Sequence, residues 1–480
     1  MLFNSFEFLL FLPVVFLLYW KVFYRLRVQN LFVVAASYLF YGWWNWRFLL
    51  LIALTTVCSY ASGLLLERFD GRDGLRKLVS ISNIVLNLGV LCIYKYFDFF
   101  SASLSAMMAA LGIGLDKVTL DLILPVGISF YTFQALSYTI DVYRGKIAPT
   151  HDVPAFFAYI SFFPQLVAGP IERATNLLPQ FLGPRRFDYG QAVEGMRQIL
   201  WGLFKKMVVA DNCAEVVNYV FDGYQSIDGG MLVWGDVFFA FQIYGDFSGY
   251  SDIAIGTARL FGIRLMRNFN FPYLSRDIAE FWRRWHISLN TWFIDYIYIP
   301  LGGSRRGTAI AIRNVLVIFL LSGLWHGADW TFVGWGAFNA LLFIPLLIAG
   351  KNRTHSSGVV AAGRVTPTLL ELLQIAVTFA FVTVGWIIFR SDTVSQAWGY
   401  IYRMFAEFEP VLPLMYKKAL VSVAILMAVE WLQREREFGL QFPDKGLFRH
   451  KVVRWVVYYM VFLLILVWSH SPEDFIYFQF

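Results

Sequence analysis

The chain has 480 residues, of which 58% are hydrophobic, 19% aromatic and only 15% charged. Ordinary globular proteins carry roughly 25% charged residues, so most of this chain must face lipid or other apolar helices, and a disordered chain, a coiled coil and a disulfide scaffold are excluded. The formal net charge of +7 comes from bases clustered between apolar runs, which indicates orientation in a membrane and not binding to nucleic acid.

Long apolar windows recur along the chain, and a helix needs about 20 such residues to cross a bilayer. The windows without a charged residue are 28–46, 48–66, 122–140, 153–171, 330–350, 372–389 and 455–472. Those that tolerate a few charges are 8–24, 78–97, 231–258, 309–328 and 411–431. The sequence therefore predicts an all-α, polytopic integral membrane bundle with about eleven or twelve membrane-embedded helices in a single domain, residues 1–480.

Other segments are too short or too polar to span. Residues 195–210 and 286–301 predict interfacial or re-entrant helices. The longer segments 172–206 and 259–313 mix bases with aromatic residues, which favours helices at the cytoplasmic interface; a solvated loop is an equal alternative for 172–206. Residues 351–367 resemble a linker.

The placement of bases also predicts the topology. Lys21, Arg25 and Arg27 follow the first window, and the segments 67–77 and 434–454 are rich in bases. Because positive loops remain in the cytoplasm, both termini are expected outside. The cysteines, Cys58, Cys92 and Cys213, lie in apolar surroundings without CxxC spacing, which predicts buried free thiols.

His326 is the first catalytic candidate, because it lies between two apolar runs in the sequence LSGLWHGADW. An ionisable residue at membrane depth is a functional hypothesis by default. Gly323 and Gly327 leave room beside its ring for a substrate or a closely packed helix. The alternative is a core histidine that bonds to a neighbouring carbonyl group.

His286 is the second candidate, with Arg283 and Arg284 just before it. Nearby positive charge disfavours the protonated imidazole, so His286 should be less basic than usual, although it could equally be a structural hydrogen-bonding group. The remaining histidines, His151, His355, His450 and His470, lie in expected loops or near the end of a span. Asp246 and Asp252 lie within an apolar stretch, where such acids either relay protons or cap broken helices.

Several short stretches together resemble the membrane-bound O-acyltransferase (MBOAT) superfamily, and within it the alginate O-acetylation branch. They are Met1–Phe6, Ala36–Tyr41, Leu124–Phe130, Phe163–Ile171, Asp246–Asp252, Arg284–His286, Trp325–Gly327 and Phe475–Phe480. The resemblance extends over roughly residues 1–480.

This resemblance implies a multi-pass bundle with a central tunnel, in which acetyl passes from a cytoplasmic thioester on coenzyme A or a carrier protein, with acetyl-CoA the expected donor. The acetyl group is handed across the membrane for O-acetylation of an exported polysaccharide, and the direct acceptor stays open. His326 matches the catalytic histidine of the superfamily, and His286 a second histidine typical of the branch. A periplasmic acetyltransferase partner and a bacterial inner membrane are implied as well. No bound cofactor, metal or nucleic acid is expected.

The tentative substrate-binding residues are Trp325, Asp295, Asn290, Arg283 and Arg284. A neutral imidazole can accept a hydroxyl proton as the oxygen attacks the thioester, which suits His326 to the role of general base. Two other classes remain open, a secondary transporter and a non-catalytic scaffold of a polysaccharide export complex.

Overall fold

The computed structural model describes all residues except 168, 444–445, 470–474 and 477–480. Every regular element of the described chain is helical. The chain divides into two compact units: Met1–Ala192 with Ala258–Leu265, and Val193–Thr257 with Met266–Phe480. Helices α10 (Tyr189–Leu203) and α12 (Gly229–Leu260) carry residues of both units.

Six helical segments of the described residues are long and apolar enough to cross a membrane. They are Leu26–Arg68, Asp73–Ala110, Thr308–His326, Trp330–Ile348, Leu369–Arg390 and Lys451–Trp468. The first segment comprises two helices, α2 (Leu26–Asn45) and α3 (Leu49–Arg68), joined by the short turn η2 (Trp46–Phe48). The all-helical, multi-pass membrane class is therefore confirmed.

Two of the other expected spans are not continuous helices. Window 153–171 breaks at Phe162 into α7 (Val153–Ser161) and α8 (Phe163–Leu166), each too short to cross a bilayer. In window 122–140, helix α6 (Ile128–Tyr143) begins only after Gly127, whose φ of 73° ends the preceding extended chain. The apolar composition was recognised correctly in both windows, but proline and glycine divide the backbone.

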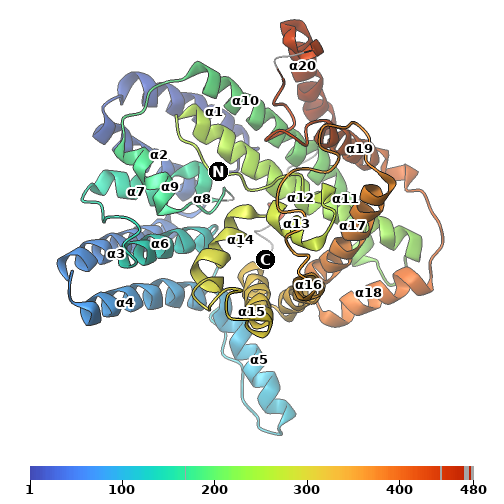
Figure 1. Cartoon of the computed structure of the whole chain (residues 1–480), viewed down its shortest axis with the longest axis horizontal. Helices are drawn as coiled ribbons and strands as arrows, with labels where there is room; N and C mark the ends of the chain where they lie inside the picture. The colour runs from blue at the N-terminus through green and yellow to red at the C-terminus, as the bar shows by residue number, and fades with distance from the viewer. Residues whose placement is uncertain (168, 444–445, 470–474, 477–480) are drawn as a thin grey trace. The chain divides into compact units, whose positions relative to one another are not determined.

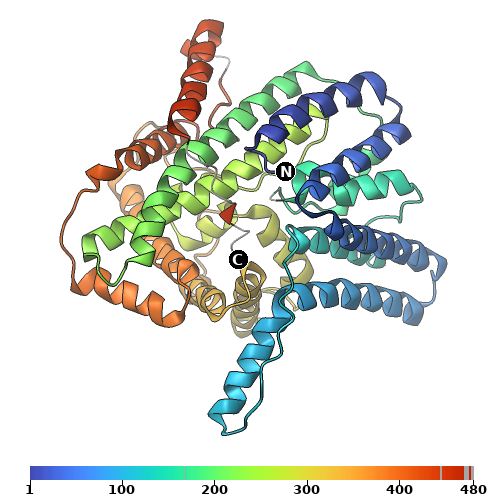
Figure 2. The same cartoon turned by 180° about the vertical axis from the view of Figure 1, so that it is seen from behind.

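In the first unit, helices α3, α4 (Asp73–Leu91) and α6 lie side by side (Figures 1 and 2). Asn83 of α4 joins the three helices, because its amide nitrogen lies 3.4 Å from Ser59 Oγ of α3 and its Oδ1 accepts from Thr139 Oγ1 of α6 at 3.0 Å. Such buried polar contacts fix helices in membranes, where burial of apolar surface gives little driving force. The remaining helical elements of this unit are α1 (Phe6–Leu17), η1 (Leu18–Val22), η3 (Cys92–Tyr96), α5 (Phe97–Ala110) and α9 (Ala174–Leu182).

The second unit is organised around α12. Helix α10 continues through the π-helix η4 (Phe204–Ala210) into α11 (Asp211–Asp222) and packs closely on α12. A Cβ atom on Gly202 would lie 2.6 Å from the carbonyl oxygen of Gly249, so only glycine permits this approach. The other helical elements of the unit are η5 (Pro272–Leu274), α13 (Ile278–Arg284), α14 (Ile287–Phe293), η6 (Ile294–Tyr298), α15 (Thr308–His326), α16 (Trp330–Ile348), α17 (Leu369–Arg390), α18 (Val394–Ala406), η7 (Leu414–Tyr416), α19 (Lys417–Leu432), η8 (Gly446–Arg449) and α20 (Lys451–Trp468).

Two smaller expectations need correction. The segment 351–367 contains turns, but Val360 and Ala361 are buried in a cluster with Phe271 and Leu274, so it is more than a free linker. All three cysteines are free thiols, yet only Cys213 is buried, whereas Cys58 is half-buried and Cys92 is exposed.

Candidate active site

The two candidate histidines lie close together in the second unit. His326 is the last residue of α15, and His286 lies between α13 and α14. Their ring centroids are 6.3 Å apart, and their exposed fractions are only 4% and 1%. The ring of Trp325 lies beside both, 5.6 Å from His286 and 5.0 Å from His326. Residues far apart in the sequence thus form one buried site.

Aromatic side chains from three further elements surround this pair. The ring of His326 meets Trp335 of α16 at 5.1 Å and Phe389 of α17 at 5.4 Å, both edge to face. On the other side, Phe247 of α12 lies 4.6 Å from the ring of His286, and Phe269 lies at 6.4 Å. Apolar surroundings favour the uncharged form of an imidazole, which is the form that accepts a proton.

The turn after His326 explains the two glycines beside it. Gly327 is extended, and Asp329 caps α16 by accepting from the backbone nitrogen of Thr331 at 2.9 Å. A Cβ on Gly327 would lie 2.0 Å from the ring of Phe332, and one on Gly323 would lie 2.2 Å from the carbonyl oxygen of Phe332. Of the two expected uses of this space, the structure therefore shows the closely packed helix.

The backbone of His286 has an unusual conformation. Its φ of 44° and ψ of 52° lie in the left-handed region, which costs a non-glycine residue energy and persists only where the surroundings hold it. This loop lies outside the six segments that could span the membrane. Burial lowers the pKa of His286 to about 3, so the imidazole is neutral near pH 7. Its low basicity was expected, but the cause is burial and not the preceding arginines.

Arg284 and Arg283 are already engaged by the protein. Arg284 is buried, and its Nη2 donates to Glu280 Oε1 at 2.8 Å and to the carbonyl oxygen of Gly358 at 2.9 Å. Arg283 donates to the carbonyl oxygens of Asn352 at 2.8 Å and His355 at 3.2 Å. Both guanidinium groups therefore stabilise the structure around the His286 loop.

The other tentative binding residues have different surroundings. Asn290 donates both amide hydrogens at 2.6 Å, to the carbonyl oxygens of Trp282 and Trp285, and thereby closes the turn between α13 and α14. Asp295 is half-buried in η6. Among the five tentative residues, Trp325 is the one whose ring lies against both histidines.

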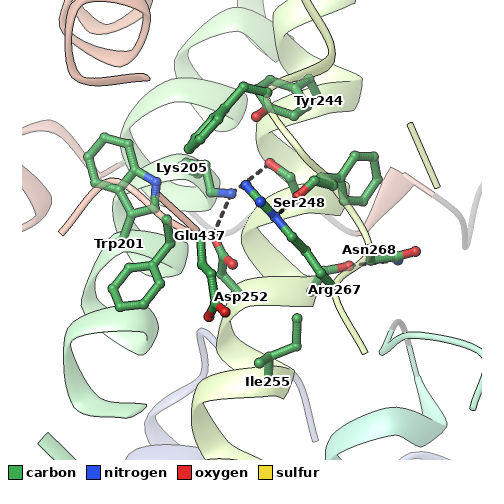
Figure 3. A pocket seen from close by; sticks show the side chains of 13 residues that line it. Trp201, Lys205, Tyr244, Ser248, Asp252, Ile255, Arg267, Asn268 and Glu437 are labelled. Carbon is green, nitrogen blue, oxygen red and sulfur yellow. Dashed lines mark hydrogen bonds and ion pairs between the residues drawn. The ribbon is translucent and has the colours of Figure 1, made fainter. Parts of the chain in front are cut away.

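A narrow, partly open cavity lies next to this site, and Figure 3 shows the side chains that line it. Phe269, whose ring faces His286, also lines the cavity. Inside it, Lys205 Nζ lies 2.8 Å from Ser248 Oγ and 2.6 Å from Asp252 Oδ2. Arg267 and the exposed Glu437 also line it. The cavity thus combines a polar, charged interior with an aromatic wall shared with the histidine site.

Comparison with known proteins identifies the family. The model of the MBOAT, membrane-bound O-acyltransferase, family matches residues 38–358. The chain belongs to the membrane-bound O-acyltransferase family. It is 40% identical over 407 residues to the protein named "Probable alginate O-acetylase AlgI" of Pseudomonas aeruginosa, a match that covers 85% of this chain and 75% of that protein.

Two further relatives show the range of the family. A peptidoglycan O-acetyltransferase of Helicobacter pylori is 34% identical over 429 residues, covering 83% of this chain and 78% of the relative. A teichoic acid D-alanyltransferase of Bacillus subtilis is 27% identical over 277 residues, covering 55% of this chain and 68% of the relative. This chain is accordingly a multi-pass membrane acyltransferase.

Asp246 and Asp252, the two acids of the apolar stretch in α12, both form ion pairs with lysines. Lys206 Nζ lies 2.8 Å from Asp211 Oδ1 and 3.0 Å from Asp246 Oδ1, while Lys205 pairs with Asp252. Asp246 also accepts from the backbone nitrogen of Ile476 at 2.6 Å. Asp246 and Asp252 lie inside α12, so neither of them caps a broken helix. The adjacent lysines Lys205 and Lys206 in the segment 195–210 were the signal for these pairs.

The other histidines of the acyltransferase lie elsewhere. His151 is exposed and 3.0 Å from Glu67, and His355 lies 3.8 Å from Asp277. His450 is exposed at the start of α20, and His470 lies outside the described residues.

Sequence reasoning missed Asn268, which bonds to the His286 loop. A single asparagine in an aromatic segment gives no recognisable signal.

Proposed function

We propose that this acyltransferase transfers acetyl from cytoplasmic acetyl-CoA through the histidine site, for O-acetylation of an exported, alginate-like polysaccharide. The observation that carries the proposal is the pairing of His326 with His286 in a buried aromatic site beside a polar cavity. The printed names of the relatives, an alginate O-acetylase and a peptidoglycan O-acetyltransferase, support acetyl as the group and a polymer as its destination.

His326 acts as the general base in this proposal. Its neutral imidazole takes the proton of the acceptor hydroxyl as the oxygen forms a bond to the acetyl carbonyl carbon. The carbon–sulfur bond then breaks, and the thiolate leaves with the electron pair. A thiol has a pKa of about 8.5, so the thiolate leaves readily and receives the proton back from the imidazolium. Atoms and charge balance without a metal or another cofactor.

His286 serves as a positioning group. It is neutral near pH 7, so it can hold the thioester or the acceptor by a hydrogen bond without taking the proton. Trp325 lies against both imidazole rings and would define the space between the two substrates. Holding both reactants in the correct geometry contributes more to the rate than proton transfer alone.

In this proposal the cavity marks the side of the site from which the donor enters. Glu437 and Phe438 line it, and they belong to the base-rich segment 434–454 that the positive-inside rule places in the cytoplasm. Lys205 and Arg267 line this cavity together with Asp252 and Glu437, so Lys205 would bind a phosphate of the donor only by giving up its ion pair with Asp252. Arg283, Arg284 and Asn290 would act on the donor through the loops that they stabilise. Asp295 stays a proposed substrate-binding residue.

The acceptor side faces outward in this proposal. The acetyl group leaves the site for a hydroxyl presented by a periplasmic acetyltransferase partner, which places it on the polymer. The membrane is then the inner membrane of a bacterium, as the bacterial relatives support.

Sealed membrane vesicles of both orientations test this function. Radiolabelled acetyl-CoA is supplied outside inside-out and right-side-out vesicles that contain the protein and its periplasmic partner, and acetyl ester is measured. We expect ester only when the donor reaches the face that carries loop 67–77. A secondary transporter would instead accumulate a solute without ester formation, and a scaffold would form no ester in either orientation; either result overturns the proposal.

A further inference from the structure

Asn268 lies in the segment between α12 and η5 and is completely buried. Its side chain joins two elements of the site: Nδ2 donates to Ser251 Oγ of α12 at 3.0 Å, and Oδ1 accepts from Ser288 Oγ of α14 at 2.9 Å. The backbone nitrogen of Ser288 also lies 3.3 Å from this Oδ1. The amide therefore links α12 to the first turn after His286.

The backbone around Asn268 holds the same loop. The backbone nitrogen of Ile287 donates to the carbonyl oxygen of Asn268 at 2.9 Å, and that of Asn270 donates to the carbonyl oxygen of Arg284 at 2.9 Å. Residues 268–270 thus bond to the chain on both sides of His286. A left-handed conformation at a non-glycine residue costs about 1–3 kcal/mol and persists only where its surroundings determine it.

We infer that Asn268 is a positioning residue, whose side chain holds His286 at the angle required for acetyl transfer. This inference rests on the proposed function of His286. Asn268, labelled in Figure 3, lines the cavity together with Ser251. The same amide therefore links the wall of this cavity to the loop that carries His286. Asn268 acts through His286 and need not touch the reacting atoms itself.

The side chain and the backbone of the Asn268 segment make different hydrogen bonds, so a role in positioning can be tested apart from a role in folding. Replacement of Asn268 by alanine removes the three side-chain bonds but leaves the backbone bonds from Ile287 and Asn270 in place. The loop should therefore still form, with more freedom at His286. Displacement of a positioned group by about 1 Å can cost on the order of 100-fold in rate. For Asn268→Ala we expect a loss of about 10- to 100-fold in kcat.

Two comparison variants sharpen the test. Asn268→Asp retains the oxygen that accepts from Ser288 and should lose less activity than the alanine variant. Asn212 is an equally well-buried asparagine of the second unit, and its Nδ2 donates to the carbonyl oxygens of Val208 at 2.8 Å and Trp468 at 3.1 Å. Asn212→Ala therefore controls for the loss of a buried amide away from His286.

The deciding experiment combines a double-mutant cycle with chemical modification. Rates of acetyl transfer per folded molecule are measured for Asn268→Ala and Asn212→Ala, each in the wild-type and in the His286→Ala background. We expect the loss from Asn268→Ala to fall below about threefold once His286 is absent, because the two residues act as one unit. An undiminished loss in the His286→Ala background would make Asn268 a structural residue only and would overturn the inference.

The second measurement does not depend on activity. Diethyl pyrocarbonate carbethoxylates accessible imidazoles, and mass spectrometry of peptides distinguishes His286 from His326. We expect modification of His286 to be about tenfold faster in Asn268→Ala than in the wild type or in Asn212→Ala, since local opening exposes buried groups. An unchanged rate contradicts the inference. A wild-type protein that transfers no acetyl would refute the proposed function, while the modification rates would still test the contact.

Discussion

The two histidines are held in different ways, and the difference predicts different consequences of replacement. His326 ends a helix and is enclosed by the rings of Trp325, Trp335 and Phe389. His286 is held by a strained loop and faces Phe247 and Phe269. The first is the proposed base and the second the proposed positioning group.

Replacement of His286 should reduce activity without abolishing it. Loss of one hydrogen bond between partly desolvated groups costs about 1–3 kcal/mol, or roughly 5- to 150-fold in rate. His286→Gln should retain measurable transfer and His286→Ala less, as determined from initial rates at saturating acetyl-CoA, normalised to folded protein. A rate near that of the wild type for His286→Ala would exclude a role in the site, and no activity in His286→Gln would exclude a role limited to positioning.

The burial of His286 also predicts a dependence of stability on pH. Its pKa is lowered to about 3 in the folded protein, whereas an exposed histidine has a pKa of about 6.5. Below about pH 6.5 the unfolded chain binds a proton that the folded site does not, so the free energy of unfolding decreases as the pH falls toward about 3. His286→Gln lacks this group and should lose less stability over the same range.

Thermal unfolding in detergent at a series of pH values measures this effect. As the pH falls, the Tm of the wild type should decrease more than the Tm of His286→Gln. His450 is exposed, so His450→Gln serves as the control and should follow the wild type. Parallel curves for wild type and His286→Gln would show that His286 is protonated in the folded protein at these pH values.

At the scale of the elements, the hairpin of α15 and α16 determines the position of His326. Because a Cβ on Gly327 would lie 2.0 Å from the ring of Phe332, Gly327→Ala must displace either the ring or the turn. We expect this overpacking to lower the free energy of unfolding by about 1–3 kcal/mol and to reduce the rate of acetyl transfer clearly. In Gly334→Ala of α16 the nearest side-chain atom is 3.7 Å away, so this variant should be almost silent.

Measurements of thermal stability and acetyl transfer for both glycine variants test the packing of this hairpin. Combining Gly327→Ala with Phe332→Ala should recover part of the lost activity, because the smaller side chain removes the clash. A fully active Gly327→Ala protein would show that the turn is not fixed as the structure has it.

Composition and hydropathy predicted the helices whose interactions are mostly with lipid or with their sequence neighbours. Windows 28–46, 48–66 and 330–350 became α2, α3 and α16 with small changes at the ends. Window 153–171 was divided by Pro164, and α5 was not expected at all. Hydropathy averages over a window and therefore does not register a single break in the backbone.

The candidate site was predictable only in part. The motifs around His286 and His326 identified both histidines, but the sequence could not show that their rings are 6.3 Å apart. The contacts of Asn268 and the pairing of Lys205 with Asp252 depend on elements that meet only in three dimensions. Arg284 resembled a donor-binding residue in the sequence, whereas its bond to Glu280 becomes visible only in the fold.

At the scale of the whole molecule, the distribution of bases predicts that both termini lie outside and that loops 21–27, 67–77 and 434–454 lie in the cytoplasm. The prediction can be tested by placing a cysteine at Arg72 in a background without Cys58, Cys92 and Cys213. A membrane-impermeant maleimide should label residue 72 only in inside-out vesicles; labelling in intact cells would contradict this topology.

The central claim is that His326 is the base for acetyl transfer, and one measurement tests it most directly. Acetyl transfer and the amount of folded, membrane-inserted protein are determined in the same membranes for wild type, His326→Ala and the control His450→Ala. The account predicts normal amounts of all three proteins and no measurable transfer by His326→Ala, because a site that excludes bulk water then has no proton acceptor. A low yield of His326→Ala with normal activity per surviving molecule would contradict the account and make His326 a structural residue of the core.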